Sequence, residues 1–334
     1  MKLHVGGVQK AVEVQKGSDN TQYYFRRAGQ FIYGKQNFFN GAIGVVPKNL
    51  DYYESTKDVP SFDVAPYVDS EWLLHFVARP EVYKPQEALS TGTGSKRFHV
   101  NAFYNLEIPL PSLTEQIKIK TYFDCVDSLI TLHQRKYEKL KSMKAALLEK
   151  MFPSENETTP KIRFKGFTEA WEQRKLNEIV SYASSSLSAK DAADDGKWNL
   201  YDANQLIGKT NLFFVRDDYI TIIKDGAGVG RVRLLPKNSA FIGTMGVLLP
   251  LNSDLLFDYA LLTKADLSRK FSGSTIPHIY FKDYGNETYR SPSLLEQQKI
   301  GSLFEQLDSL ITLHQRKCEK LKNLKKSLLE RMFI

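Results

Sequence analysis

The chain has 334 residues, of which 42% are hydrophobic. This length and composition are typical of two folded domains with connecting elements, and they exclude intrinsic disorder. Lysine and arginine number 46 against 38 aspartate and glutamate, a formal charge of +8 that favours an anionic partner such as nucleic acid. No secretory leader pattern and no run of about 18 apolar residues occurs, and the two cysteines, Cys125 and Cys318, form no disulfide framework. We therefore expect a cytoplasmic protein with no membrane contact.

Residues 1–110 indicate a first α/β domain. A glycine-rich loop followed by a strand covers Gly41 to Asn49, and helical spacing covers Glu71 to Ala78. The stretch Gly94 to Val100 is a further glycine-containing loop that carries His99.

Residues 111–152 predict one long amphipathic helix. Apolar residues recur along it at intervals of three and four, which is typical of a helix with coiled-coil character. Pro111 and Glu115 are helix-opening signals, and Pro153 stops the helix. We expect His133, on or beside the apolar stripe, to pack there with its ring nitrogens hydrogen-bonded rather than to bind a metal.

A linker is expected at residues 153–160, followed by a second α/β domain at residues 161–291. Thr168 is predicted to cap a short helix that runs through Ile179. Helical spacing returns from Leu255 to Phe271. The predicted strands, which are separated by glycines, are Leu212–Val215, Tyr219–Ile223, Arg231–Leu235 and Gly246–Leu249.

Residues 292–334 repeat the long helix, with His314 in the place of His133. The stretch Asp127–Lys136 returns letter for letter as Asp308–Lys317. A duplication of this long period indicates a molecule with two similar halves. We expect the two copied helices to share one function, and the two diverged domains to carry two versions of a second function.

The diverged domains keep weaker parallels. The loop and strand at Gly41–Asn49 match Gly228–Asn238. The stretch Gly94–Val100 matches Gly273–Ile279, which sets His99 against His278.

No catalytic motif is recognisable in the chain. The run Gly226–Gly230 lacks the G-x-G-x-x-G spacing of nucleotide-binding loops and precedes a strand, so we interpret it as a turn. The triplet Gly208-Lys209-Thr210 ends like a P-loop, but Ala203 stands where the first glycine belongs. Carboxylate pairs such as Asp217-Asp218 are expected to be turn residues. With no cluster of cysteine and histidine either, we expect neither a metal nor a cofactor in this chain.

Three features carry a resemblance to a known family. They are the run Ile162-Arg163-Phe164-Lys165-Gly166-Phe167 leading to Trp171-Glu172, the Pro-Ser-Leu-x-Glu-Gln boxes at 111–116 and 292–297, and the Leu-Ile-Thr-Leu-His-Gln-Arg-Lys helices. In the order variable domain, long helix, variable domain, long helix, the chain resembles the DNA-specificity subunit of type I restriction-modification systems over nearly its whole length.

The resemblance implies an α/β protein with two target-recognition domains, separated by two long helices that pack as an antiparallel coiled coil in a pseudo-two-fold repeat. Each domain would read one half of a bipartite, interrupted site in double-stranded DNA. The helices would set the spacing and dock methyltransferase subunits and restriction (endonuclease and translocase) subunits. Chemistry that uses S-adenosylmethionine, ATP and Mg would belong to these partners, so no enzymatic activity is expected of this chain. Self-association through the helices stays open.

Basic and polar loop residues are the candidates for DNA contact, because phosphates bind lysine and arginine while base edges bind polar side chains. In the second domain they are Lys209, Thr210, Asn211, Lys224, Arg231, Arg233, Lys237, Ser274, Thr275, His278, Tyr280 and Lys282. In the first domain they are Lys35, Gln36, Asn37, Asn40, Lys48, Ser95, Lys96, Arg97 and His99.

The first domain lacks a counterpart of the segment that opens the second at Ile162. The chain is then a shortened gene product, a segment of a recombining specificity gene, or part of an assembly whose front another chain completes. We expect the second domain to be the competent reader. The alternative function is a truncated subunit or helical scaffold that binds partners without reading DNA, and a DNA-modifying enzyme ranks third because no motif supports it. A DNA reader should lose affinity steeply with salt, whereas a scaffold should not.

Overall fold

A computed structural model describes residues 1–12, 19–92, 95–273 and 277–333. The chain divides into two compact units. Unit 1 comprises Met1–Gln134 with Gln315–Ile334, and unit 2 comprises Arg135–His314. Among the described residues, none of the helices combines the length and apolar character that crossing a membrane requires.

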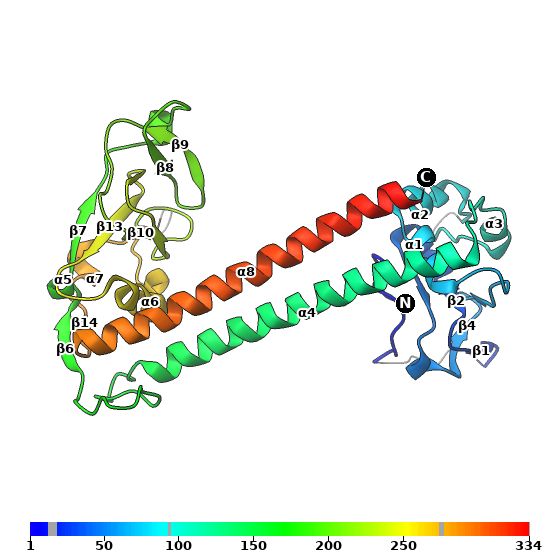
Figure 1. Cartoon of the computed structure of the whole chain (residues 1–334), viewed down its shortest axis with the longest axis horizontal. Coiled ribbons are helices and arrows are strands. Elements are labelled where there is room, and N and C mark those ends of the chain that lie inside the picture. The colour runs from blue at the N-terminus through cyan, green and yellow to red at the C-terminus, as the bar shows by residue number, and fades with distance from the viewer. Residues whose placement is uncertain (13–18, 93–94, 274–276, 334) are drawn as a thin grey trace. The chain divides into compact units, whose positions relative to one another are not determined.

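Unit 1 contains two small antiparallel sheets (Figure 1). In the three-stranded sheet, β2 (Phe31–Tyr33) lies between β3 (Ile43–Val45) and β5 (Ser61–Phe62), and β1 (Tyr23–Arg26) pairs with β4 (Tyr53–Thr56) in the other. The helical segments are η1 (Lys35–Asn40), η2 (Lys48–Leu50), α1 (Ser70–Val77), α2 (Pro80–Tyr83), η3 (Lys84–Leu89) and α3 (Val100–Tyr104).

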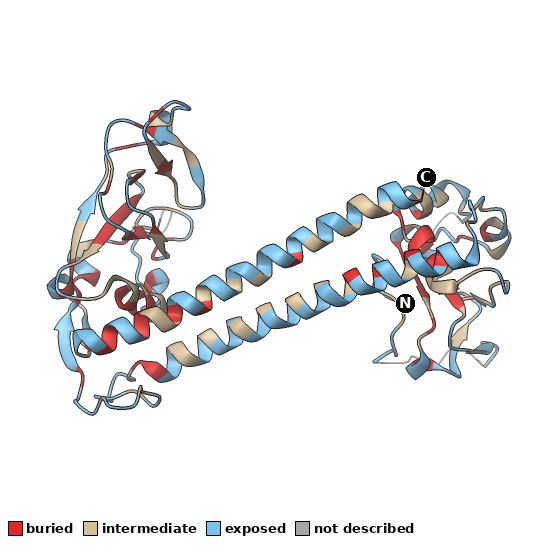
Figure 2. Ribbon diagram, viewed as in Figure 1, coloured by how far each residue is buried: buried red, intermediate tan, exposed pale blue. Residues whose placement is uncertain are grey.

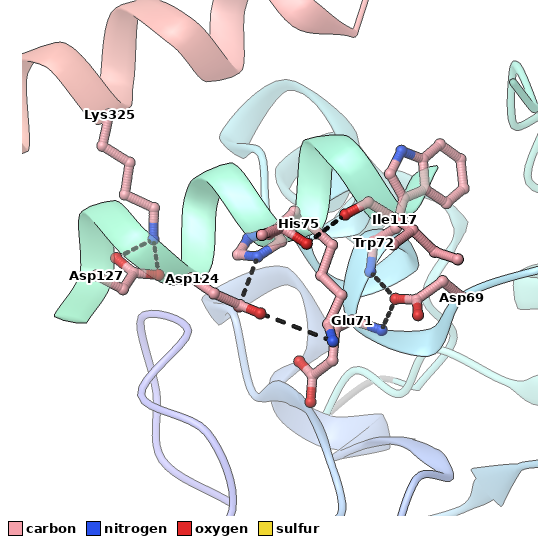
Figure 3. Close-up of polar contacts among 10 residues, drawn as sticks. Asp69, Glu71, Trp72, His75, Ile117, Asp124, Asp127 and Lys325 are labelled. Carbon is pink, nitrogen blue, oxygen red and sulfur yellow. Dashed lines mark hydrogen bonds and ion pairs between the residues drawn. The ribbon is translucent and has the colours of Figure 1, made fainter. Parts of the chain in front are cut away.

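Aromatic side chains form the core of unit 1. Tyr33 of β2 packs against Phe38, Phe98 and Phe103, and all four are buried. Helix α1 begins where the Asp69 carboxylate accepts hydrogen bonds from the backbone N–H groups of Glu71 and Trp72, at 3.0 and 2.9 Å (Figure 3). An aspartate N-cap of this kind satisfies donors that the first helical turn leaves free.

Unit 2 is built on a four-stranded antiparallel sheet in the order β11-β10-β13-β7. Its strands are β7 (Val180–Ser184), β10 (Tyr219–Ile223), β11 (Val232–Leu235) and β13 (Met245–Pro250). A second sheet pairs β8 (Trp198–Tyr201) antiparallel with β9 (Leu206–Thr210) and parallel with β12 (Ser239–Phe241). The remaining elements are β6 (Glu172–Lys175) paired with β14 (Thr288–Ser291), α5 (Leu176–Ile179), η4 (Ala189–Asp191), α6 (Leu255–Ala265), η5 (Leu267–Arg269) and α7 (Phe281–Tyr284).

The core of unit 2 lies between the four-stranded sheet and α6. All five residues of β10 are buried, and Ile220 and Ile222 share a cluster with Phe257 and Leu261 of α6. Figure 2 shows buried residues in the sheet and in α6, while the β8–β9 hairpin is mostly intermediate in exposure.

The two copied segments form α4 (Leu113–Met151) and α8 (Leu294–Met332), each of 39 residues. In unit 1, Asp127 from the first half of α4 binds Lys325 from the second half of α8. In unit 2, Lys144 from the second half of α4 binds Asp308 from the first half of α8. The helices therefore run antiparallel beside each other within each unit, as the resemblance implied. Both cysteines are free, as expected.

Three expectations about local structure were wrong. Residues 212–215 form no strand: the Phe214 ring stacks on Trp198, with centroids 4.2 Å apart, and only Val215 makes a bridge, to Ser239. Thr168 caps no helix, since pairing with β14 draws Glu172–Lys175 into β6. The helix expected to reach Phe271 ends at Ala265, where Asp266 takes the left-handed conformation with φ 45°.

Candidate nucleic-acid interface

In unit 2, the end of the central strand β10 meets the loop before α7. The Lys224 N–H donates to the Thr244 carbonyl at 3.0 Å, and the Lys224 carbonyl accepts from the Ile279 N–H at 2.9 Å. The Gly226 N–H donates to the Pro277 carbonyl at 3.0 Å, and a bridge joins Ser272 to His278. Two loops far apart in the sequence are thus held side by side.

The side chains at this junction combine positive charge with aromatic rings. His278 Nδ1 lies 2.7 Å from Asp225 Oδ1, and the His278 ring stacks on Tyr280 with centroids 6.3 Å apart. Lys282 Nζ lies 5.4 Å from the centre of the Tyr280 ring, and both residues are exposed. Asp225 holds the imidazole in place, so the junction presents a positioned histidine, an exposed tyrosine and an exposed lysine, the groups that bind bases and phosphates.

Arg231 and Arg233 tie the β8–β9 turn to the main sheet. Arg231 Nη2 donates to the Ala203 carbonyl at 2.6 Å and to Asn204 Oδ1 at 2.8 Å. Arg233 Nη1 donates to the Asp202 carbonyl at 3.1 Å. Each guanidinium keeps further donors, so these arginines position the turn and remain able to meet a phosphate.

The glycine run before Arg231 is a turn between β10 and β11, as the sequence indicated. At Gly230, where φ is 80°, an added Cβ would lie 2.4 Å from the Leu267 carbonyl carbon. The backbone of η5 therefore approaches too closely for any other residue.

The remaining candidates of unit 2 occupy the second sheet and its turns. Lys209 of β9 and Lys237, after β11, are exposed. Thr210 is buried and its hydroxyl accepts from the Leu212 N–H at 3.3 Å, while Asn211 Oδ1 accepts from the Lys197 N–H at 2.9 Å. Ser274 and Thr275 lie outside the described residues.

Unit 1 repeats the junction of unit 2. The Lys35 N–H donates to the Asp58 carbonyl at 2.9 Å, and the Lys35 carbonyl accepts from the Phe98 N–H at 2.8 Å. A bridge joins Thr91 to Arg97, as Ser272 is joined to His278. Lys35 thus takes the place of Lys224, and Phe98 takes the place of Ile279.

This correspondence corrects the alignment made from sequence, which set His99 against His278. The hydrogen bonds match Arg97 with His278, and His99, which precedes α3, with Tyr280, which precedes α7. Short glycine-containing loops are easily misaligned by a residue or more when only their sequences are compared, whereas backbone hydrogen bonds define which residues correspond.

The charged side chains of the unit 1 junction are paired and exposed. Arg97 Nε lies 3.7 Å from Asp58 Oδ1, and Lys96 Nζ lies 2.8 Å from Glu87 Oε1. His99 is also exposed. The other candidates lie on neighbouring turns: Gln36 and Lys48 are exposed, Asn37 Oδ1 accepts from Asn40 Nδ2 at 3.2 Å, and Ser95 is half-buried. The sequence missed the carboxylates Asp58 and Asp225, because only the folded chain brings them beside Arg97 and His278.

The family model for the type I restriction modification DNA specificity domain matches residues 68–142 and 168–323. These two stretches make up more than half of the chain, and each runs from a domain into its long helix. The chain belongs to this family of specificity subunits. The matched stretches include both boxes and the identical segments Asp127–Lys136 and Asp308–Lys317, which confirms the resemblance seen in the sequence.

Known relatives agree with the family assignment. The specificity subunit of the type I restriction enzyme MjaVIII from Methanocaldococcus jannaschii is 25% identical over an alignment of 275 residues, and the match covers 71% of this chain and 64% of that protein. The chain therefore matches less than two thirds of that relative's length.

Solved structures of the family share the fold. The crystal structure of the type I S subunit from M. genitalium superposes with a TM-score of 0.68 at 18% identity, over 93% of this chain and 84% of that one. A structure from work on complex assembly and conformational transition of the type I system has a TM-score of 0.51 at 18% identity, over 95% and 84%. The predicted fold class, two α/β target-recognition domains with two long helices, is confirmed.

The described residues provide no group of three or more histidine, cysteine, aspartate or glutamate side chains that could hold a metal ion. The specificity-subunit family is itself non-catalytic.

Proposed function

We propose that this chain reads a bipartite, interrupted site in double-stranded DNA, with one half-site bound at the junction of each unit. The observation that carries the proposal is that the same loop arrangement occurs in both units. In both units a lysine after the central strand anchors a loop that presents a basic or aromatic pair, Arg97 with His99 or His278 with Tyr280. Two copies of one reader on one chain suit a site in two parts.

Each class of side chain has its own part in this proposal. His278, held by Asp225, and Arg97, which lies beside Asp58, meet base edges, because a positioned side chain discriminates between donor and acceptor patterns. Exposed lysines contact phosphates, and Tyr280 offers a stacking or sugar contact. Thr210 drops out of the contacting set because its hydroxyl is buried and used within the protein.

The proposed assembly follows the predicted domains. Residues 1–110 and 161–291 are the two readers, residues 111–152 and 292–334 are the spacer helices, and residues 153–160 are the linker. Methyltransferase and restriction subunits dock on the helices and supply adenine methylation and cleavage with S-adenosylmethionine, ATP and Mg. The chain acts in the cytoplasm and contributes specificity alone.

The test is to co-express the chain with a cognate methyltransferase subunit and map adenine methylation across a genome by single-molecule sequencing. One interrupted bipartite motif is expected. The variant His278→Ala should relax one half of the motif and Arg97→Ala the other, each base contact being worth about 1–3 kcal/mol. Lys190→Ala, which removes an exposed charge of unit 2 outside the candidate set, should leave the motif unchanged.

Other outcomes separate the alternatives. A palindromic motif would mean that two chains read with unit 2 alone. A stable complex that methylates nothing, and binds DNA without steep salt dependence, would favour a partner-binding scaffold and overturn the proposal.

A further inference from the structure

A buried ion pair joins the opening segment of unit 2 to the start of α8. Arg163 Nε and Nη2 lie 2.7 and 2.8 Å from the two carboxylate oxygens of Glu296, which is only 1% exposed. The Arg163 guanidinium also donates to the Glu169 carbonyl at 2.7 Å. This bidentate pair clamps the segment onto the helix.

The duplicated position in unit 1 has the same carboxylate without the arginine. Glu115 of α4 stands where Glu296 stands in α8, in the same Pro-Ser-Leu-x-Glu-Gln box. Glu115 is exposed, and within the part of the chain that the structure describes its carboxylate has neither an ion pair nor a hydrogen bond. The Glu115 carboxylate is therefore available to pair with an arginine.

The same segment of unit 2 places a tryptophan in the core. Trp171 is 2% exposed and packs on Phe152 and Phe257, with ring centroids 5.9 Å away in both cases. By the repeat, Phe333 corresponds to Phe152, and Trp72, three residues after the α1 N-cap, corresponds to Phe257.

Within the described part of unit 1, no counterpart of Trp171 fills this place. Trp72 and Phe333, with Leu110, Glu115, Ile119 and Met332, line an open pocket of about 220 Å³. Met332 is exposed, whereas its counterpart Met151 is buried.

The face of the long helix differs between the units in the same way. On α8, Lys299 Nζ lies 4.9 Å from the Phe167 ring, and Phe164 packs beside Leu303. On α4, the counterparts of Gln298 and Leu303 are Ile117 and Tyr122, which are 47% and 45% exposed. On α4 the places that Phe164 borders in unit 2 are thus taken by two exposed apolar side chains.

We propose that this surface of unit 1 is the docking site for a peptide segment of a separate polypeptide with the chemistry of residues 162–172. An arginine pairs with Glu115, aromatic side chains cover Ile117 and Tyr122, and a tryptophan enters the pocket beside Trp72 and Phe333. The spacing Arg-Phe-x-x-Phe-x-x-x-Trp occurs once in the 334 residues, at Arg163–Trp171, where unit 2 already uses it. The occupant is therefore a segment from outside these 334 residues.

Side chains rather than strand pairing anchor this segment. In unit 2, Gln173 of β6 pairs with Arg290 of β14. The counterpart of Arg290 is Pro109, which has no N–H to donate. Among the described residues, Glu107–Leu110 has no strand partner.

The test uses the full chain and a fluorescein-labelled synthetic peptide of residues 158–175, titrated by fluorescence anisotropy. Saturable one-to-one binding is expected. Glu115→Arg should weaken it roughly tenfold or more, because a charge-assisted bidentate pair becomes a repulsion. Ile117→Lys should weaken it as well, and a peptide with Trp171→Ala should lose binding.

Matched variants make the result specific. Glu54→Arg makes the same charge change at an exposed site of β4 and should leave affinity unchanged. A peptide carrying Arg163→Glu should bind the Glu115→Arg chain better than the wild-type chain. This rescue distinguishes unit 1 from displacement of the native segment in unit 2.

Three results would overturn the proposal. They are no binding to the intact chain at peptide concentrations near about 1 mM, binding that ignores both Glu115→Arg and Ile117→Lys, and a stable dimer of the chain that Glu115→Arg dissociates, since the occupant would then be a second copy. The assay contains no DNA and no methyltransferase, so its failure leaves the proposed DNA reading untouched.

Discussion

Lys325 of α8 donates to both carboxylate oxygens of Asp127 on α4, at 2.7 Å each (Figure 3). In unit 2, Lys144 Nζ lies 2.5 Å from Asp308 Oδ1. Lys144 and Lys325 are equivalent positions of the repeat, as are Asp127 and Asp308. The duplicated helix therefore makes one contact twice, once within each unit, with the roles of α4 and α8 exchanged.

Breaking the Lys325–Asp127 pair should cost little, because Lys325 is 25% and Asp127 44% exposed. We expect a coupling energy of about 0.5–1 kcal/mol from a double-mutant cycle with Lys325→Met and Asp127→Asn. Urea unfolding of the full chain measures it, and added salt should shrink it. The charge-reversed pair, Lys325→Asp with Asp127→Lys, should recover most of the loss; equal destabilisation by the reversed and single variants would argue against the ion pair.

The glutamine of each box is buried and joins two backbone groups by hydrogen bonds, so its removal should lower the free energy of unfolding. Gln297 Oε1 accepts from the Asp254 N–H at 2.9 Å, and its Nε2 donates to the Pro292 carbonyl at 2.9 Å. Gln116 makes the same two contacts with Asp69 and Pro111, at 2.8 and 2.9 Å.

Gln297→Ala would leave these partners without hydrogen bonds inside the protein. We expect a loss of about 1–3 kcal/mol of unfolding free energy, measured by chemical denaturation. The neighbouring exposed Gln298→Ala should change stability by less than about 0.5 kcal/mol. A null effect of Gln297→Ala would show that water replaces the amide.

Gly301 allows α6 to lie against α8. A Cβ at Gly301 would stand 2.5 Å from Asp254 Oδ1 and 2.8 Å from the Phe257 nitrogen. Gly→Ala in a free helix gains about 1 kcal/mol, but here the overpacking cost of about 1–3 kcal/mol dominates and also disturbs the α6 N-cap. Thermal unfolding of Gly301→Ala should show net destabilisation, whereas Lys120→Ala, at the matching position of α4, should be nearly neutral. Stabilisation by Gly301→Ala would contradict the close approach.

Asp258 should make unit 2 more stable at lower pH. Burial raises the pKa of this carboxyl from an ordinary 3.8 to about 7. Ser253 Oγ lies 2.9 Å from the Ile179 carbonyl and 2.5 Å from Asp258 Oδ2, and its one proton serves the carbonyl only if the Asp258 carboxyl is itself protonated and donates.

The stability from Asp258 is complete below pH 3.8 and is lost as pH rises to about 7, where the folded carboxyl ionises. The full change is at most about 4 kcal/mol. Asp258→Asn, whose amide donates as the protonated acid does, should therefore be more stable than the wild type near pH 8, with the difference shrinking towards about pH 5. Unfolding curves of both proteins across this range provide the measurement, and parallel pH profiles would refute the assignment.

The spacing of apolar residues and the positions of the prolines were enough to predict the two long helices. Apolar spacing and the flanking prolines predicted both long helices to within a few residues, because a helix depends on contacts three and four positions away. The strand Tyr219–Ile223 was also predicted, since a short apolar run flanked by glycine and acidic turn residues is typical of a buried strand.

Long-range pairing escaped prediction. The strand β6 exists because β14, more than a hundred residues later, pairs with it, and the sequence of Glu172–Lys175 has no strand character of its own. The two reader loops were predicted to be basic and polar, but His99 was set against His278, whereas the backbone hydrogen bonds match His278 with Arg97.

The repeated sequence by itself determines that this chain has two similar halves and two long helices, because the spacing of apolar residues that defines a helix can be read directly from the sequence. Only the folded backbone decides that Lys35 and Lys224 hold equivalent loops, that Asp58 meets Arg97 and Asp225 meets His278, and that Glu296 is covered while Glu115 is open. Those contacts join residues distant in sequence, so their energies depend on the path of the chain and not on its composition.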